Sequence, residues 1–255
     1  RILNRTERQV GVQYALLLRN TRRTLQDYYE SYADKDGLLH YSDMLKYDRL
    51  KKMENQLEGL VKESMVPIGK SIRAGMRESL TESFVRSTAA IGDEVSRTLI
   101  TVMKPEIIQQ AIQNPVSGLT LNQRLAVRRS DIIIRINETL TQGLYRGESY
   151  KDMSKRLKTV IENDTVKATR IIRTEGHRVQ EAGKFESMAS AANQGVITKK
   201  WWLSSQDNRV RDHHEHMANK YSKNSPIPYE EDFVNDQTGG RGPHPGALGV
   251  AEDDI

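Results

Sequence analysis

A seventeen-residue stretch, WWLSSQDNRVRDHHEHM (201–217), holds many of the residue types that carry chemistry in proteins. Two tryptophans, two arginines and several acids accompany His213, His214 and His216. Histidine acts near neutral pH as a general acid, a general base or a metal ligand. The stretch therefore fits an acid–base site, a metal site or the packed core of a small domain.

The spacing of this stretch predicts a short helix from about residue 208, with Asp207 as its N-cap. Val210, His214 and Met217 would share one face of that helix, and Arg211 would lie beside His214. We therefore expect His214 at the edge of the core, with an acid and a guanidinium within reach. A histidine in such a place is more often held by hydrogen bonds from its neighbours than used as a ligand or base, so a structural role is favoured.

A metal site made of histidines alone is disfavoured by their spacing. His213 and His216 lie one helical turn apart, and His244 in GPHPG is a candidate third ligand. The zinc-protease spacing His-Glu-x-x-His is absent from the sequence. Adjacent and alternating residues also splay around a helix, so these imidazoles are not expected to converge.

A hydrolase is the enzymatic alternative. Glu175 and His214 would form the acid and base of a ribonuclease-like site, and Arg211 would stabilise an oxyanion or a phosphate. An ion pair that ties two elements together explains the same residues more simply. The phosphate-binding P-loop, the dinucleotide fingerprint, the G-x-S-x-G elbow and the kinase motifs do not occur in the sequence.

Basic residues cluster in several helical segments, and the chain has a formal net charge of +5 with a pI of about 9.3. One cluster consists of Arg124, Arg128, Arg129 and Arg135. Aromatic residues are not interleaved with it, so any contact with nucleic acid would go to phosphates and would ignore sequence. A solvated helix face, or a face that meets an acidic protein, is the more common role of such a cluster.

The composition favours long helices. Of the 255 residues, 36% are hydrophobic and 29% charged, with three Phe and two Trp. There is no cysteine, which excludes disulfides and thiolate metal sites within these residues. No apolar run approaches the roughly 20 residues that a membrane-spanning helix needs.

Helical periodicity dominates the chain up to about residue 192. It predicts helices over 2–32, from 42 toward 66 and beyond, over 77–103, from about 132 to Gly147, from a capping box at Ser149–Asp152, and over 165–192. We expect Pro67 and Gly69 to kink or interrupt the second helix. The clearest loop, around 115–118, divides a helical region, 1–118, from a second region, 119–255.

The faces of these helices follow from their three- and four-residue steps. The inner positions are predicted to be Val10, Tyr14, Leu17, Thr21, Leu25, Tyr28 and Tyr32, then Ile132, Ile136, Leu140 and Leu144, then Met153, Leu157 and Val160, then Ile172, Gly176, Val179 and Gly183. Residues 193–203 carry the one convincing strand signal, and from residue 221 the chain reads as loop with at most one short strand. The fold class is therefore mainly α, with a small α+β part over 193–255.

Four motifs in a fixed order resemble the phage head morphogenesis family, whose members are Mu protein F-like minor head proteins. The motifs are TLTQGLYRGESYKDMSKRLK, ATRIIRTEGHRVQEAGKFESM, KKWWLSSQDNRVRDHHEHM and GGRGPHPGALGVAEDDI. They cover about residues 119–255. The resemblance places the family's signature polar residues at Arg173, Thr174, Glu175, Trp202, Asp207, Arg209, Arg211 and His214.

The resemblance implies a minor capsid protein of the virion, located inside the capsid near the portal and in the host cytoplasm during assembly. Its partners would be the portal, capsid and scaffold proteins, with sequence-independent DNA contact during packaging or ejection, and region 1–118 would dock on the portal or capsid. No cofactor and no catalytic residue is implied. Family members typically continue into Asn-Cys-x-Cys after such a tail, so His214 would ligate a metal only if cysteines followed Ile255. Some proteins with this domain resemble carriers of toxin or nuclease modules, which keeps the RNA-cleaving alternative open.

Overall fold

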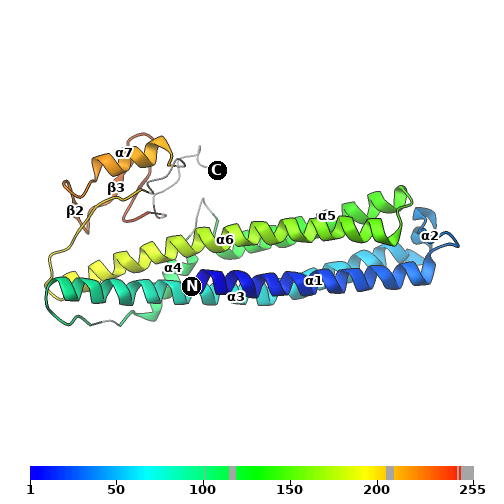
Figure 1. The fold of residues 1–255 in the computed structure, drawn as a ribbon, viewed down its shortest axis with the longest axis horizontal. Coiled ribbons are helices and arrows are strands. Elements are labelled where there is room, and N and C mark those ends of the chain that lie inside the picture. The colour runs from blue at the N-terminus through cyan, green and yellow to red at the C-terminus, as the bar shows by residue number, and fades with distance from the viewer. Residues whose placement is uncertain (101, 115–118, 205–209, 246, 248–255) are drawn as a thin grey trace. The chain divides into compact units, whose positions relative to one another are not determined.

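Long helices make up most of the chain, and the predicted class, mainly α with a small α+β part at the C-terminal end, is confirmed (Figure 1). The structure is a computed structural model that describes residues 1–100, 102–114, 119–204, 210–245 and 247. The long helices are α1 (Ile2–Tyr32), α3 (Arg49–Glu94), α5 (Leu121–Tyr145) and α6 (Tyr150–Asn193). The short helices are α2 (Tyr41–Leu45), η1 (Lys46–Asp48), α4 (Pro105–Gln113) and α7 (Asp212–Lys220), and the strands are β1 (Lys199–Lys200), β2 (Ile227–Pro228), β3 (Phe233–Val234) and β4 (Arg241–Gly242).

The chain forms two compact units, and each unit combines segments that are distant in sequence. Unit 1 comprises Arg1–Ala74 and Asn122–Arg173, and unit 2 comprises Gly75–Leu121 and Thr174–Ile255. The unit boundaries therefore fall inside α3 and α6. The division of the chain at residue 118 into a docking region and a family domain stays a prediction.

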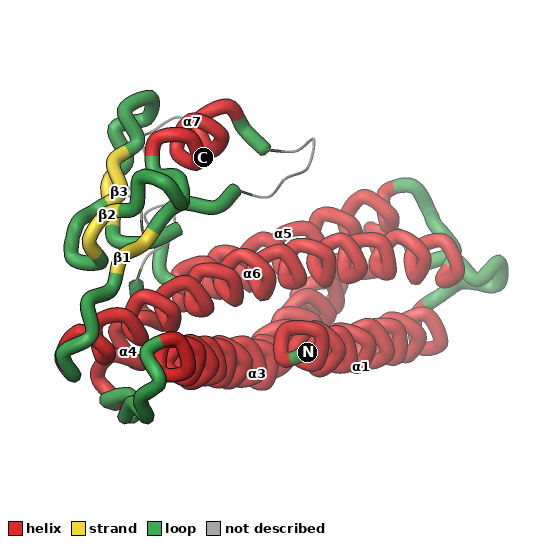
Figure 2. The backbone as a smooth tube through the Cα atoms, turned by 60° about the vertical axis from the view of Figure 1, so that its left-hand side comes forward, coloured by secondary structure: helices red, strands yellow, loops and turns green. Residues whose placement is uncertain are grey.

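Unit 1 is a bundle in which α1, the first part of α3, α5 and the first part of α6 lie side by side (Figures 1 and 2). The predicted inner face of α1 is buried from Val10 to Leu25, and all four predicted positions of α5 are buried. Toward the end of α1 the buried tyrosine is Tyr29, whereas Tyr32 is 38% exposed. In α6 the buried residue is Ile161 rather than Val160, because the four-residue step from Leu157 continues there.

Two predicted interruptions of helices do not occur. Helix α3 continues through Pro67 without interruption, and α6 is one helix where two were expected. Around Pro67 both flanks bury apolar side chains in unit 1, Val61 before it and Ile68 after it. This packing offsets the backbone hydrogen bond that proline cannot make. The break instead lies upstream, at Tyr47 and Asp48, whose φ angles of 55° separate α2 from α3.

The ends of α5 and α6 follow the predicted signals. Gly147 has a φ of +62° just after α5. The backbone N–H of Asp152 donates to Ser149 Oγ at 3.3 Å, which caps the start of α6. Helix α3, in contrast, ends at Glu94 and not near residue 103, because the N–H of Arg97 donates back to the carbonyl of Gly92 at 2.9 Å.

In unit 2 the second parts of α3 and α6 pack with their backbones in close approach at Gly183. A Cβ on Gly183 would lie 2.5 Å from the carbonyl oxygen of Leu80, so only glycine fits without a shift. Beside this contact, Ser83 Oγ donates to the carbonyl of Gln180 at 2.7 Å. Helix α4, which the sequence analysis does not predict, also belongs to this unit.

The small α+β part of unit 2 is built on two antiparallel pairs of two-residue strands. β1 pairs with β2 and β3 pairs with β4. Within the predicted strand 193–203 the turn at Gly195 is present, with a φ of +84°, but only Lys199 and Lys200 form a strand. A core of Trp202, Met217, Tyr221 and Phe233 holds this part together.

Candidate functional site

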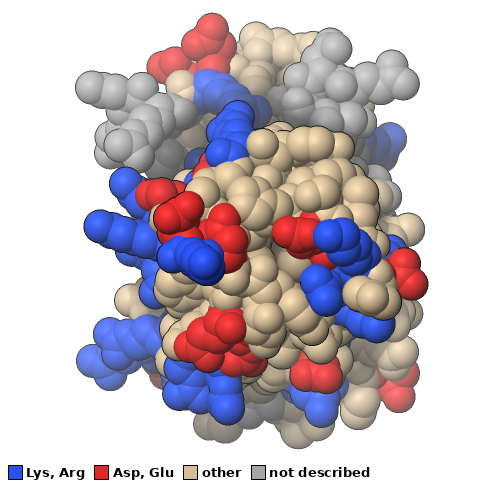
Figure 3. Space-filling model, turned by 90° about the vertical axis from the view of Figure 1, so that its right-hand side faces the viewer, with Lys and Arg blue, Asp and Glu red and all other residues tan. Residues whose placement is uncertain are grey.

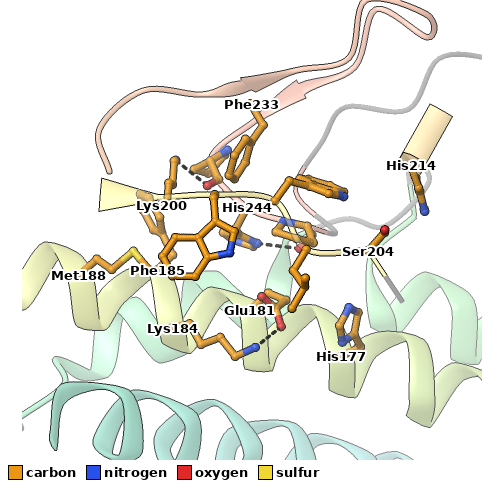
Figure 4. Close-up of a pocket in the computed structure, with 15 residues that line it drawn as sticks. His177, Glu181, Lys184, Phe185, Met188, Lys200, Ser204, His214, Phe233 and His244 are labelled. Carbon is orange, nitrogen blue, oxygen red and sulfur yellow. Dashed lines mark hydrogen bonds and ion pairs between the residues drawn. The ribbon is translucent and has the colours of Figure 1, made fainter. Parts of the chain in front are cut away.

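Unit 2 contains a pocket of about 640 Å³ between α6 and the small α+β part (Figure 4). Helix α6 supplies one wall. The other wall is formed by the segments around β1 and β3 and by residues 243–245. The lining residues are His177, Glu181, Lys184, Phe185, Met188, Lys200, Trp201, Trp202, Leu203, Ser204, His214, Phe233, Pro243, His244 and Pro245. Both tryptophans of the chain and three of its six histidines therefore lie at one site.

The α6 wall follows from helical periodicity. His177, Glu181, Lys184, Phe185 and Met188 recur at three- and four-residue steps, so they share one face of the helix. Lys184 Nζ donates to Glu181 Oε1 at 2.6 Å, and Phe185 and Met188 give the wall an apolar section. The wall thus carries both charge and apolar surface.

Lys200 is the most unusual charged residue of the site. Its side chain is 4% exposed, and its ammonium lies 5.1 and 4.8 Å from the ring centroids of Phe185 and Phe233. Lys200 Nζ donates one hydrogen bond, to the carbonyl oxygen of Pro243 at 2.7 Å. Burial lowers the pKa of Lys200 from 10.5 to about 8, because the charged form loses hydration, while Asp232, Glu231 and Glu230 oppose the shift from a distance.

His244 is the buried histidine of the pocket. It is 9% exposed, its Nδ1 lies 2.8 Å from the carbonyl oxygen of Pro245, and its ring packs 5.8 Å from the ring of Phe185. Burial lowers the pKa of His244, and the nearby cations of Arg178 and Lys200 add to the effect. Burial in this wall therefore favours the neutral imidazole, against the opposing effects of the Pro245 carbonyl and Glu181.

The structure brings two family-signature residues, Trp202 and His214, to the pocket. Trp202 is buried as part of the small core, and its ring centroid lies 6.1 Å from that of His214. His214, expected at the core edge, is exposed. Helix α7 begins at Asp212 with Arg211 as its N-cap, so Val210 precedes the helix and Met217 is its buried residue.

Glu175 lies away from the pocket lining. It is 1% exposed, and its Oε2 accepts hydrogen bonds from Arg178 Nε and Nη2 at 3.0 and 2.9 Å. Arg178 also donates to the carbonyl of Ala111, near the end of α4, at 2.5 Å. Glu175 is thus paired with Arg178 in a buried ion pair, which is a structural arrangement and not that of an accessible general acid.

The remaining signature residues are dispersed. Arg173 is exposed and its Nε donates to Glu7 Oε1 at 2.8 Å within unit 1, while Thr174 and Arg211 are exposed in unit 2. Asp207 and Arg209 lie outside the described residues. A single polar network of Glu175, Asp207, Arg211 and His214 stays a prediction.

The predicted nucleic-acid contacts are partly engaged with carboxylates in unit 1. Arg128 Nη1 lies 3.1 Å from Asp131 Oδ2, and Arg135 Nε lies 3.3 Å from Asp131 Oδ1. Arg124 is half-buried and Arg129 is exposed. On the face of the molecule drawn in Figure 3, acidic and basic side chains are interspersed.

The expectations about a metal site and about a membrane-spanning helix can be compared with the described residues only. Within the described residues, no three His, Asp or Glu side chains gather in a group that could hold a metal ion. His213 is half-buried with its ring 4.5 Å from that of His214, and His216 lies 3.7 Å from Asp236. No helix in the described ranges is long and apolar enough to cross a membrane.

Sequence reasoning missed Lys200 and the α6 wall. The wall was accessible from the sequence, since the steps from His177 to Glu181, Lys184 and Met188 are helical. Burial of Lys200 was not, because it depends on contacts with Phe185, Phe233 and Pro243, which lie 15 to 43 residues away.

Comparison with known proteins adds an independent line of evidence. Residues 134–244 match the family model described as Phage Mu protein F like protein. The chain is 29% identical to the minor head protein GP7 of Bacillus phage SPP1 over 254 residues. This alignment covers 99% of this chain and 80% of that protein.

A second relative has a different printed activity. The chain is 22% identical to NAD(+)--arginine ADP-ribosyltransferase EFV of Enterococcus faecalis over 225 residues. This alignment covers 88% of this chain and 45% of that protein. The chain therefore spans less than half the length of that enzyme. No solved structure matches the chain with significance.

Proposed function

We propose, from the premise that this chain belongs to the Mu protein F-like family of phage minor head proteins, that it is a portal-associated structural component of the head, incorporated during procapsid assembly. A structural role in the phage head and a place in the virion follow from the family itself. The observation that carries the proposal is the alignment with a minor head protein over 99% of the chain.

The exposed face of α1 supports docking through the N-terminal region. Val12 and Leu16 are 57% and 39% exposed, and Arg8 and Arg19 lie on the same face at helical steps. Apolar side chains bordered by cations suit contact with a larger protein assembly. We infer that region 1–118 docks on the portal or capsid, with the scaffold protein as a further partner during assembly in the host cytoplasm.

Contact with DNA during packaging or ejection belongs to the same proposal. It is supported by the net charge of +5 and by the exposed side chain of Arg129. Titration of duplex DNA at increasing salt measures it, because a protein that neutralises phosphates loses affinity steeply as salt rises. Binding that does not depend on salt, or no binding at low salt, would remove DNA from the list of partners.

A non-enzymatic role agrees with the chemistry of the described residues. The RNA-cleaving alternative required Glu175 and His214 as an acid and base pair. Glu175 is buried against Arg178, whereas His214 is exposed at the pocket. Incubation of the chain with labelled RNA, with and without a divalent metal, tests the alternative, and cleavage that is lost in His214→Ala would revive it.

Quantitative peptide mass spectrometry on purified particles and empty procapsids tests the structural proposal. We expect the chain in both, at a low and fixed ratio to the portal protein. Val12→Asp should reduce incorporation without changing the melting temperature, whereas Val127→Asp, at a 49% exposed valine of α5, should leave incorporation unchanged. Absence of the wild-type chain from both particle types would overturn the proposal.

A further inference from the structure

The positive charge of the buried Lys200 ammonium is only partly compensated by its neighbours. A lysine ammonium has three N–H donors, and among the described residues only the carbonyl of Pro243 accepts a hydrogen bond from it. No carboxylate of the described chain forms an ion pair with Lys200, although its side chain is 4% exposed. Buried charges are normally paired, so this ammonium is suited to an anion that enters the pocket.

The part of the pocket beside Lys200 is apolar and open. Trp201 and Leu203 are 46% and 75% exposed, and Phe185 and Met188 line the pocket beside them. Figure 4 shows Phe185 and Met188 extending from α6 on the side where Lys200 lies. Exposed large apolar residues at a pocket rim indicate a surface that another molecule covers.

The titratable groups around the pocket favour an anionic occupant. Lys184 is partnered by Glu181, the one carboxylate among the described lining residues, so this pair is close to neutral. Lys200 then remains a cation without an ion-pair partner among the described residues, since Asp232, Glu231 and Glu230 act on it only from a distance, and the imidazoles of His177, His214 and His244 also line the pocket. The site therefore complements one negative charge beside an apolar group.

We propose that this pocket binds a segment of another head protein that presents a carboxylate to Lys200 and an adjacent large apolar side chain to Phe185, Met188 and Trp201. The volume of about 640 Å³ accommodates side chains of that size. The open rim at Trp201 and Leu203 allows a polypeptide to pass across the pocket. The identity of the partner as a head protein rests on the proposed function, whereas the acidic and apolar chemistry rests on the pocket alone.

Tryptophan fluorescence offers a direct assay, because the only two tryptophans of the chain, Trp201 and Trp202, both line the pocket. The probes are acetylated and amidated tripeptides, Leu-Asp-Leu with Leu-Asn-Leu and Ser-Asp-Ser as controls. A saturable change in fluorescence is expected with Leu-Asp-Leu, and weaker binding with both controls. Overlapping peptides from the other head proteins of the same phage, assayed in the same way, identify the natural segment.

Variants at neighbouring positions test whether the peptide binds in the pocket or elsewhere on the surface. Lys200→Met keeps the side-chain volume but removes the charge, and it should weaken binding by about ten- to a hundredfold, as the loss of a charge-assisted hydrogen bond does. Leu203→Ser, at an exposed position, should weaken binding without changing the melting temperature. Lys199→Met is the matched control: Lys199 is the preceding residue of β1, exposed and outside the pocket lining, so binding should stay unchanged.

The outcomes distinguish this inference from the proposed function. Binding that is equal for wild type, Lys200→Met and Leu203→Ser, or no binding by any probe or head-protein peptide, overturns the inference even if the chain is found in particles. Binding of Leu-Asp-Leu that depends on Lys200, in a chain that is absent from particles, leaves the pocket chemistry standing and overturns the head-protein partner.

Discussion

Arg178 donates two hydrogen bonds to a single carboxylate oxygen of Glu175, three residues earlier on α6, and both residues are almost completely buried. A third donor of Arg178 reaches the carbonyl oxygen of Ala111. The guanidinium thus compensates a buried carboxylate and joins α4 to α6 within unit 2. Because the site is desolvated, the removal of either partner is expected to destabilise the fold.

Arg178→Met should therefore lower the free energy of unfolding by about 3–5 kcal/mol, since it removes the guanidinium that donates to the buried Glu175 carboxylate. Urea unfolding followed by circular dichroism measures the loss. The double variant Glu175→Gln with Arg178→Met should lose less than Arg178→Met alone, because the buried carboxylate charge is then removed together with the guanidinium. A double variant that is as unstable as the single one would show that packing, and not charge, is the main contribution.

The contact between Glu175 and Arg178 was accessible from the sequence but was not predicted. A three-residue step on a helix places Arg178 next to Glu175, and this local relationship needs no tertiary information. The expected network of Glu175 with Asp207, Arg211 and His214 depends on tertiary contacts and stays a prediction. Helix α7 begins at Asp212, about four residues later than predicted, so Val210 lies outside it and Met217 is its buried residue.

Periodicity predicted the helical faces well and the small α+β part poorly. Ile132, Ile136, Leu140 and Leu144 repeat every fourth residue, and all four are buried. The strands contain two residues each, so they are fixed by contacts between distant segments, such as Lys200 with Ile227. No local pattern encodes such contacts, and the same is true of the pocket that they shape.

A second prediction concerns the polar contact in the core of unit 1. Tyr14 Oη donates to Asp164 Oδ2 at 2.6 Å, and Arg128 Nη1 lies 3.9 Å from the other oxygen. Burial raises the pKa of Asp164, because desolvation outweighs the hydroxyl and the nearby cations. Tyr14→Phe removes the hydroxyl donor from this carboxyl group and should cost about 1–3 kcal/mol.

Urea unfolding of Tyr14→Phe beside Tyr28→Phe tests that assignment. Tyr28 is half-buried on the same helix and contacts the ring of Tyr32. Its substitution should change the free energy of unfolding by less than about 0.5 kcal/mol, as most surface changes do. Equal losses in the two variants would mean that the hydrogen bond to Asp164 is not a significant source of stability.

A third prediction follows from the buried imidazole of His244. Its pKa is lowered from 6.5 in the folded chain, so below about pH 6.5 the unfolded chain binds more protons at this residue than the folded one. The contribution of His244 to stability is therefore complete above that pH and is lost as the pH falls toward the lowered pKa. Thermal melts between pH 7 and pH 5 should show a smaller decrease for His244→Gln than for the wild type. His177→Gln, at an exposed position on the same pocket, is the control, and a pH dependence altered equally in both variants would refute the role of burial.

The last prediction uses two glycines in helices that differ in their surroundings. Gly183→Ala would place a Cβ 2.5 Å from the carbonyl oxygen of Leu80, so α3 and α6 must move apart, and we expect a loss of about 1–3 kcal/mol. Around Gly59 of α3 a Cβ would meet no atom within 4 Å. Gly59→Ala should therefore stabilise the chain by about 0.5–1 kcal/mol, because alanine loses less backbone entropy in a helix than glycine. Urea unfolding of both variants measures these opposite signs. A neutral or stabilising effect of Gly183→Ala would contradict the close approach of the two backbones at this position.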